Sequence, residues 1–361
     1  MRRSDPLIVG GGPAGSAAAI TLARSGAKPL IIERQQETGD ALCGGFLSWR
    51  TLETLGRLGI ANPGGHRVTA LRLLAGPARA EARLPRAAIG ISRRALDTQL
   101  LAEAAKAGAK IERGLAVRAL DDESGLHLSD GAVLRADSLF LATGKHDLRG
   151  VARARAAADP TLGLRLRMAA HPSLTRLVGE SIELHLFERG YCGLALQEDG
   201  SANLCMAVKK SKLTEAGGQP EALLQTLATD HPALAERLGH ADHQAFDAIG
   251  AVPYGWQTWE TRSGLFRLGD QAAVIPSLAG EGNGIALASG IMAAQAWLAD
   301  GPEAACAYQS RLARAAHRPV SLATRLWQLA ERPTTALWGT RLIALLPFVA
   351  ARLAAQTRID T

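Results

Sequence analysis

A short glycine-rich stretch near the N-terminus has the spacing of a phosphate-binding turn. Gly10, Gly12 and Gly15 form a G-x-G-x-x-G pattern that encloses Pro13 and Ala14. The first glycine permits a tight turn, the second lets the backbone approach a pyrophosphate, and the third lets a helix pack closely on a strand. The free N–H groups and the positive dipole end of the following helix then face the phosphates. The spacing therefore predicts a nucleotide site.

The elements expected around this turn are those that a dinucleotide site requires. The apolar run 7–9 predicts a buried strand before the turn, and the alanine-rich residues 16–25 predict a helix after it. A second strand at 29–32 ends at Glu33, which Arg34 follows. Glu33 is placed to accept hydrogen bonds from the ribose hydroxyls of a nucleotide. This order of elements argues against a plain glycine-rich turn.

A second glycine-rich segment lies far downstream. Residues 265–270 predict a strand that ends in Gly269 and Asp270, and residues 285–297 predict a helix of small residues. Backbone N–H groups at such a helix start are suited to stabilise negative charge on a ligand. The alternative is a loop that only packs the helix on the sheet. The loop before the helix contains Pro276, Gly280, Gly282, Asn283 and Gly284.

Together the two segments resemble those of the FAD-dependent oxidoreductases of the aromatic-hydroxylase (p-hydroxybenzoate hydroxylase-like) and geranylgeranyl reductase superfamily. In that family the aspartate matched by Asp270 binds the ribityl chain, and the loop matched by 276–284 opens a helix under the isoalloxazine ring. An R-x-x-L-D pattern falls on Arg93, Leu96 and Asp97. The resemblance places this arginine near the FAD phosphates, a task that its fork of donors suits.

Two further segments agree with this resemblance. A strand expected at 137–141 runs into Ala142, Thr143 and Gly144, an A-T-G turn common to flavoproteins with two dinucleotide-binding folds. The C-G-G segment at 43–45 resembles one that lies near the isoalloxazine in geranylgeranyl reductase-like proteins. The resemblance therefore implies FAD as the cofactor.

The expected fold class is α/β. The resemblance implies a Rossmann-like FAD domain of the two-dinucleotide-binding type, an antiparallel β-sheet substrate domain and a C-terminal helical segment. We assign residues 1–159 and 256–300 to a discontinuous FAD-binding domain that carries a β-insertion near 60–90. Residues 160–255 form the substrate domain, and residues 301–361 form the C-terminal helices.

The composition excludes several other classes of protein. The chain has 361 residues and is 47% hydrophobic, which argues against a disordered, collagen-like or disulfide-stapled chain. The net charge is +7, but the arginines are dispersed and only 6 Phe and 3 Tyr are present, so we expect no nucleic-acid partner. Cys43, Cys192, Cys205 and Cys306 form no C-x-x-C pair, so we expect no metal site and a reducing, cytoplasmic compartment.

The C-terminal region is predicted to be helical, with breaks at Pro319, Pro333 and Pro347. Its most apolar part, residues 342–349, is edged by arginines. A helical lid packed on the core is the simplest interpretation, and contact with a membrane surface is the alternative. No uninterrupted apolar stretch reaches the ~20 residues of a membrane span.

Two reactions remain open for the flavin. The first is reduction of a carbon–carbon double bond by hydride from the reduced flavin, which the resemblance of the segment around Cys43 and Gly44 favours. Cys43 is then a candidate proton donor, and His185 in the alternating strand 181–187 is a candidate acid or base facing the pocket. Tyr191, Tyr254 and Trp256 are candidates for lining an aromatic pocket.

The second reaction is hydroxylation of an aromatic or polyketide substrate by a flavin monooxygenase with O2 and NAD(P)H. A non-catalytic flavin-binding protein is a third hypothesis. In either reaction the substrate is a lipophilic or aromatic small molecule. Because the sequence holds a single G-x-G-x-x-G fingerprint, the electrons come from NAD(P)H docking transiently or from a partner reductase.

Overall fold

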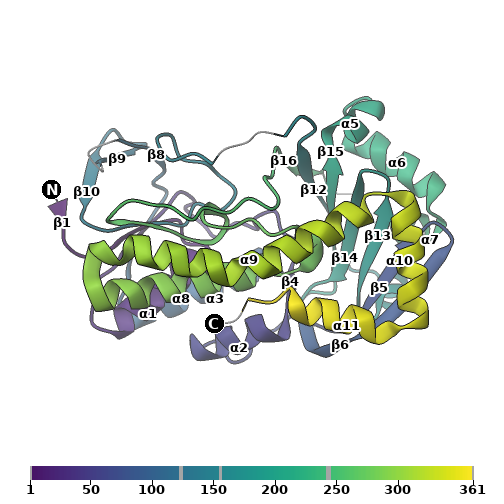
Figure 1. The fold of residues 1–361 in the computed structure, drawn as a ribbon, viewed down its shortest axis with the longest axis horizontal. Helices are drawn as coiled ribbons and strands as arrows, with labels where there is room; N and C mark the ends of the chain where they lie inside the picture. The colour runs from purple at the N-terminus through teal and green to yellow at the C-terminus, as the bar shows by residue number, and fades with distance from the viewer. Residues whose placement is uncertain (1, 122–124, 154–156, 241–244, 360–361) are drawn as a thin grey trace.

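The computed structural model describes residues 2–121, 125–153, 157–240 and 245–359, which form three β-sheets and the helices that cover them (Figure 1). The part that contains the first glycine-rich turn, residues 10–15, lies at the left of Figure 1, and we call it the nucleotide-binding part after the sequence prediction. The largest sheet lies at the right. The long helix α9 (Ala305–Ala330) runs from one part to the other. The predicted α/β class is confirmed.

A parallel five-stranded sheet forms the centre of the nucleotide-binding part. In spatial order its strands are β17 (Leu265–Arg267), β11 (Leu139–Leu141), β2 (Leu7–Val9), β3 (Leu30–Glu33) and β7 (Lys110–Arg113). The strands that precede the two glycine segments, β2 and β17, flank β11. Because parallel strands end at the same edge, this order brings both glycine segments and the A-T-G turn to one place.

Both faces of this sheet are covered, which explains its nearly continuous apolar strands. Ile8 and Ile31 face the helices, and the ring of Phe140 stacks on that of Phe266 with centroids 4.6 Å apart. The helices on this face include α1 (Pro13–Arg24), α3 (Arg93–Ala107) and α8 (Gly282–Asp300). The opposite face packs against a small sheet of β1 (Arg2–Arg3), β10 (Val133–Ala136), β9 (Gly125–Leu128) and β8 (Val117–Leu120).

Helices α1 and α8 approach each other unusually closely, because both are rich in small residues. A Cβ atom on Gly290 would lie 2.2 Å from the carbonyl oxygen of Ala14, so only glycine fits there. This contact packs the first turns of α1 against the middle of α8.

An eight-stranded sheet forms the second part. Its strands are, in spatial order, β16 (Asp247–Ile249), β12 (Thr161–Met168), β15 (Ala202–Lys209), β14 (Gly190–Leu196), β13 (Ser181–Phe187), β5 (His66–Ala75), β6 (Ala78–Gly90) and β4 (Phe46–Leu47). Neighbours are antiparallel except for β5 and β13. Three strands therefore come from residues before α3, so the sheet extends beyond the predicted substrate domain at 160–255.

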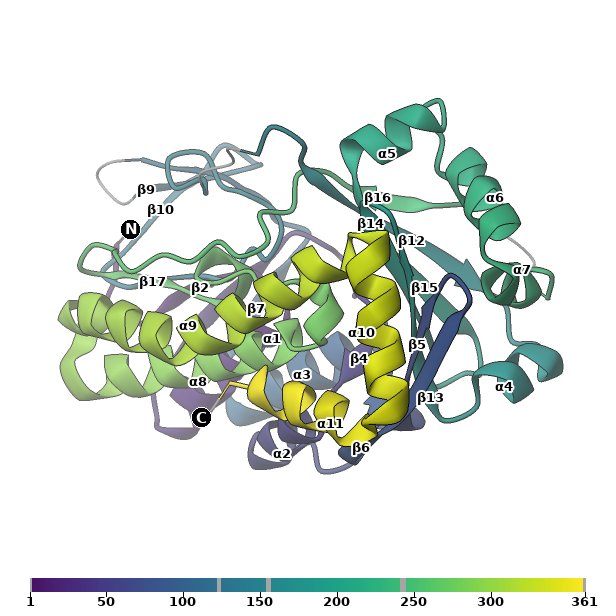
Figure 2. The same ribbon diagram turned by 45° about the vertical axis from the view of Figure 1, so that its right-hand side comes forward.

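Helices cover both faces of this sheet. The back is defined by α4 (Pro172–Val178), α5 (Lys210–Glu215), α6 (Pro220–Asp230) and α7 (Pro232–Leu238), which cover an apolar core that includes Leu164, Leu194 and Leu204. On the front lie α10 (Pro333–Leu345) and α11 (Pro347–Gln356), which contact β5 and β6 (Figure 2). Helix α2 (Trp49–Arg57) lies below α8.

One predicted helix break is wrong. Helices α10 and α11 begin at Pro333 and Pro347, as expected, but α9 continues through Pro319. Pro319 is itself buried within the long apolar face of α9. We attribute the unbroken helix to this packing, which offsets the hydrogen bond that proline cannot donate.

Candidate active site

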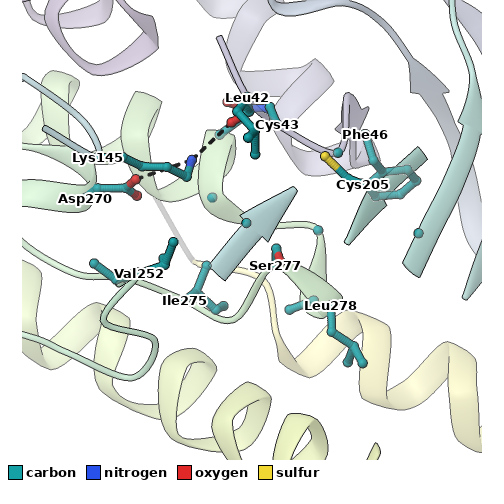
Figure 3. Close-up of a pocket in the computed structure, with 18 of the residues that line it drawn as sticks. Leu42, Cys43, Phe46, Lys145, Cys205, Val252, Asp270, Ile275, Ser277 and Leu278 are labelled. Carbon is teal, nitrogen blue, oxygen red and sulfur yellow. Dashed lines mark hydrogen bonds and ion pairs between the residues drawn. The ribbon is translucent and has the colours of Figure 1, made fainter. Parts of the chain in front are cut away.

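A single cavity of about 780 Å³ joins the nucleotide-binding part to the front of the eight-stranded sheet. Its walls come from the loops after β2, β3, β11 and β17, from the sheet, and from the C-terminal helices. Figure 3 shows Cys43, Lys145 and Asp270 on one side of it and Ser277 and Leu278 on another. The residues that the sequence analysis singled out can be located against these walls.

The first glycine turn has the geometry of a phosphate site. Gly10 adopts φ +104°, and a Cβ atom there would lie 2.4 Å from the carbonyl oxygen of Ala142. A Cβ on Gly15 would lie 2.0 Å from the carbonyl oxygen of Gly10. Gly12 caps α1 and has no side chain that could bond the first N–H groups of the helix. The N-terminus of α1 therefore opens into the cavity with its donors available to an anion.

Glu33 and Arg93 flank this turn. Glu33 Oε2 accepts a 2.8 Å hydrogen bond from the N–H of Gly11 and lines the cavity, where a ribose would meet it. Arg93 donates from Nε to Asp97 at 2.8 Å, and its Nη2 lies 3.3 Å from the place of a Cβ on Gly12. Burial lowers the pKa of the Arg93 guanidinium, but the charge of Asp97 outweighs this and raises it, so the cation persists beside the turn.

The N-terminus of α8 opens into the same cavity, and hydrogen bonds from the C-terminal tail fix the loop before it. Its capping residue, Glu281, bonds Arg358 through Oε2 at 2.5 Å instead of the helix N–H groups. Arg358 also donates to the carbonyl oxygens of Ala279 and Gly280 at 2.9 and 3.0 Å. Burial raises the pKa of Glu281 despite this partner. The C-terminal tail thus fixes the loop that begins α8.

These residues fit FAD. Two helix N-termini without side-chain caps face one cavity, an acidic residue lies beside the first, and an arginine lies near the phosphate turn. The first N-terminus suits a pyrophosphate, and the second suits the negative charge of a reduced isoalloxazine. Lys145 Nζ lies 3.7 Å from Asp270 Oδ2 and donates to the carbonyl oxygen of Leu42 at 3.3 Å, tying these loops together (Figure 3).

Most of the predicted cofactor-binding residues line this cavity. Three do not: Gly15 packs against Gly10, Gly284 packs against the side chain of Glu281, and Pro276 precedes a short 3-10 helix. The predicted residues that do line it are Gly10, Gly12, Pro13, Ala14, Glu33, Arg34, Cys43, Gly44, Arg93, Ala142, Thr143, Gly144, Gly269, Asp270, Gly280, Gly282 and Asn283.

Cys43 lies where the nucleotide part meets the sheet. Its Sγ accepts contacts from the N–H of Gly45 at 3.5 Å and from Asn283 Nδ2 at 3.7 Å. Asn203 on β15 donates to the carbonyl oxygen of Cys43 at 2.9 Å, which fixes the backbone. Cys205 lines the same cavity, but burial raises the pKa of its thiol to about 12, so it stays neutral.

A cluster of hydroxyl groups lies on the sheet side of the cavity. Tyr191 and Tyr254 both hydrogen-bond Ser277 Oγ, the second at 2.7 Å, and all three line the cavity. Burial raises the pKa of both phenols, so they stay protonated at any working pH. The sequence placed the two tyrosines in a pocket, but it gave no sign that Ser277 joins them. Trp256 is not among the residues that line the cavity.

The prediction for His185 is corrected by the structure. His185 lies on the back of β13, where its Nε2 is 3.1 Å from Glu183 Oε2, and it does not line the cavity. Its neighbours Leu184 and Leu186 do. Both faces of β13 are buried, so an alternating sequence could not tell which face meets the ligand.

Sequence analysis also missed a buried arginine that positions the Cys43 loop. Arg165 on β12 donates to the carbonyl oxygens of Asp40 and Ala41 at 2.6 and 2.9 Å and pairs with Asp247 at 2.5 Å. A lone arginine in an alternating strand carries no motif. Only the folded chain shows that it anchors the loop before Cys43.

Comparison with known proteins agrees with this site. Residues 3–129 match the FAD binding domain family. The menaquinone reductase of Mycolicibacterium smegmatis (strain ATCC 700084 / mc(2)155) is 32% identical over 160 residues, which are 41% of this chain and 39% of that protein. The match therefore spans about two fifths of that relative.

Solved structures share the fold over nearly the whole chain. PqsL of P. aeruginosa in complex with 2-aminobenzoylacetate has a TM-score of 0.74 at 18% identity, covering 94% of this chain and 99% of that one. A geranylgeranyl bacteriochlorophyll reductase-like protein from Thermoplasma acidophilum has a TM-score of 0.73 at 22% identity, covering 100% and 94%. A flavin-dependent brominase has a TM-score of 0.78 at 17% identity, covering 100% and 95%.

The fold and the site together define a flavoprotein. Residues 3–129 carry the FAD binding domain, so the cofactor of this chain is FAD. The predicted cofactor is confirmed. The likeness to the solved structures concerns the fold alone, because members of one fold catalyse different reactions.

Proposed function

We propose that this protein reduces a carbon–carbon double bond in a lipophilic, isoprenoid-like small molecule. The observation that carries the proposal is the apolar wall of the cavity, which continues from the flavin loops along the sheet. Leu73, Leu184 and Leu186 line it from the sheet, and Ile343 and Leu353 line it from the C-terminal helices. Such a wall favours a substrate with a long apolar part.

The relatives support the same class of reaction. The name of the mycobacterial relative assigns it the reduction of menaquinone, and one structural neighbour is called geranylgeranyl bacteriochlorophyll reductase-like. The C-G-G segment at 43–45, which resembles a segment of geranylgeranyl reductase-like proteins, also supports a reduction. The Sγ of Cys43 lies beside Asn283 at the start of α8.

The chain's own groups account for the proton of such a reduction. When bound and reduced, FAD supplies a hydride to one carbon of the double bond. The other carbon needs a proton, and two sources line the cavity: the thiol of Cys43 and the hydroxyl cluster of Tyr191, Ser277 and Tyr254. Both sources lie in the same cavity as the apolar wall that would hold the substrate, so we assign the proton to one of them.

The direct test is anaerobic. We expect the photoreduced protein, mixed under nitrogen with a polyprenyl quinone or another isoprenoid olefin, to be reoxidised and to yield the saturated product. Reoxidation that occurs only in air and gives a hydroxylated product would contradict the proposal and favour the monooxygenase. The electron donor is measured in the same apparatus, with NADPH and NADH compared as reductants.

Variants separate the two proton sources. Cys43→Ser and Tyr191→Phe each leave the flavin absorbance in place, and the variant that removes the true donor slows substrate reduction by at least about tenfold. Cys306→Ser, which changes an exposed cysteine, is the matched control. Unchanged rates in both Cys43→Ser and Tyr191→Phe would exclude Cys43 and Tyr191 as the proton donors.

A further inference from the structure

Most of the exposed large apolar side chains in the described part of the chain lie on or just before its last two helices. Among the residues described, nine large apolar side chains are exposed, and six of them fall between Leu329 and Phe348. Leu345 is 79% exposed, Phe348 64% and Trp338 62%. Scattered single apolar residues are normal on a soluble protein, but such a group is not. Figure 2 shows both helices at the front with no element over them.

Helix α10 is apolar on two opposite faces. Ala336 and Ile343 turn inward and line the cavity, whereas Trp338 and Leu345 are turned out to the surface. Helix α11 repeats the pattern, with its exposed Phe348 next to the cavity-lining Val349. A helix that is apolar all round belongs either in a protein core or in contact with lipid. Among the described residues, only the inner faces of the two helices are covered. We call the exposed residues Trp338, Leu342, Leu345, Leu346 and Phe348 the docking corner.

The charge around the docking corner has one sign. Between residues 332 and 359 the chain contains arginines and no acidic residue. Arg332, Arg341 and Arg352 are exposed, and the guanidinium of Arg341 lies 5.1 Å from the ring centroid of Trp338. Each arginine near an anionic bilayer contributes about 1 kcal/mol to binding. Two copies of this corner would instead bring like charges together, which disfavours a symmetric dimer.

The docking corner is continuous with the cavity. Leu342 is 49% exposed and Leu329 is 47% exposed, yet both also line the cavity. The apolar wall therefore runs from the surface of the corner, through Ile343, to Leu184 and Leu186 on the sheet. Exposed apolar side chains thus border this end of the cavity.

The two helices are suited to lie on a bilayer. No single helix among the described residues is long and apolar enough to cross a membrane. Helices α10 and α11 together have that length and apolar composition, but the chain bends by 110° between them. The inner faces of both helices pack on β6, which keeps them parallel to the protein surface.

We propose that the docking corner binds the surface of an anionic lipid bilayer and that lipophilic substrate enters the cavity there directly from the membrane. The apolar side chains reach the boundary between headgroups and acyl chains, and the arginines pair with the lipid phosphates. The entry of substrate rests on the proposed function, whereas the binding of the bilayer does not.

Flotation of the FAD-loaded protein with vesicles tests the binding. We expect binding to vesicles of phosphatidylcholine mixed with phosphatidylglycerol, and weaker binding to phosphatidylcholine alone. The double variant Leu345→Glu/Phe348→Glu should lose at least about tenfold in affinity. Arg341→Gln/Arg352→Gln should lose roughly tenfold on the anionic vesicles only. Trp259→Glu, which changes an exposed tryptophan away from the corner, should bind like the unchanged protein.

Three results would overturn the proposal: no binding of the unchanged protein to anionic vesicles, equal binding by the Leu345→Glu/Phe348→Glu variant, or equal loss in Trp259→Glu. A different outcome would assign the corner to self-association. The unchanged protein would then not bind vesicles, light scattering would show a dimer, and the Leu345→Glu/Phe348→Glu variant would be a monomer.

A second measurement separates this inference from the proposed function. The rate of reoxidation under nitrogen is compared for a short, water-soluble olefin and for a long-chain substrate held in anionic vesicles. We expect Leu345→Glu/Phe348→Glu to slow only the second rate. Vesicle binding without reduction of any olefin would leave the docking corner in place and contradict the proposed reaction. Equal slowing of both rates would contradict entry through the corner.

Discussion

On strand β13, successive side chains meet two very different surroundings. Leu184 and Leu186 face the cavity, where they form an apolar wall beside the flavin loops. Glu183 faces the back of the sheet, where it is fully buried and bonded by Arg72 and by Arg237, the latter at 2.9 and 3.0 Å. The front has room for a ligand, whereas the back is filled by charged groups that satisfy one another.

This contrast separates buried side chains that stabilise the fold from buried side chains that face the ligand space. Burial raises the pKa of Glu183, but hydrogen bonds from His185 and Arg237 outweigh it and lower the pKa to about 2. A carboxylate so held has no proton to give at neutral pH, and its partners tie α7 and β5 to β13. On β13 the side chains that face the cavity are uncharged, and Tyr191 on the neighbouring β14 is a neutral phenol. The ionised back of β13 is therefore structural, whereas its uncharged front borders the space for a ligand.

The largest effect is expected from Glu183→Gln. Removing this charge leaves two buried arginines with a weakened partner, so the free energy of unfolding should fall by roughly 3–5 kcal/mol. Urea denaturation at neutral pH measures it. Glu180→Gln, at an exposed pair with Arg67, should change stability little. Equal effects of the two substitutions would remove the distinction between the faces.

Substitution of one leucine on each face of the sheet compares how tightly the two faces are packed, without any change of charge. Leu194 is fully buried in the core behind the sheet, and Leu194→Ala should cost about 2–5 kcal/mol. Leu184 already borders the cavity, so Leu184→Ala removes fewer contacts and should cost about 1–2 kcal/mol. Equal costs would indicate that the front of the sheet is packed as tightly as the back.

The stability should also depend on pH through Glu183. Because its pKa is lower in the folded protein, its contribution is present above its unfolded pKa and is lost as the pH falls through the folded value. Between about pH 5 and pH 3 this loss amounts to about 2 kcal/mol. Other carboxylates titrate in the same range, so the measured quantity is the difference between the unchanged protein and Glu183→Gln. A difference that stays constant over that range would contradict the lowered pKa.

The smallest effect is expected from His185→Asn. Because His185 lies on the back of β13, the rate of substrate reduction at a temperature where the variant is folded should change by less than about threefold. Tyr191→Phe changes a cavity-facing group and serves as the comparison. A loss in His185→Asn as large as that in Tyr191→Phe would place His185 at the reaction after all.

The nucleotide side of the site could be predicted because its signals are local. Gly10, Glu33 and Asp270 lie in short segments whose order of strand, turn and helix fixes their geometry. The parallel sheet then brings the separate segments to one edge. The chemistry of those positions is dictated mainly by backbone, which a motif describes well.

The substrate side could not be predicted in the same way. Its wall is assembled from β5, β13, α10 and α11, which are far apart in the sequence. Both faces of β13 are buried, so no hydrophobic pattern distinguishes Leu184 from His185 as the residue that faces the cavity. The pair of Arg358 with Glu281 joins the C-terminal tail to the flavin loop without any motif at either end.

The central claim is that one FAD lies across the N-termini of α1 and α8, and equilibrium binding of FAD tests it most directly. A valine at Gly12 projects from the open phosphate turn into the space of the pyrophosphate, because only Arg93 lies near that position. We predict that Gly12→Val, measured on the apoprotein by flavin fluorescence, loses at least about 100-fold in affinity, or roughly 2.7 kcal/mol. Gly56→Ala, where a Cβ on helix α2 meets nothing within 4 Å, should bind FAD like the unchanged protein. Full FAD occupancy in a folded Gly12→Val variant would contradict the claim.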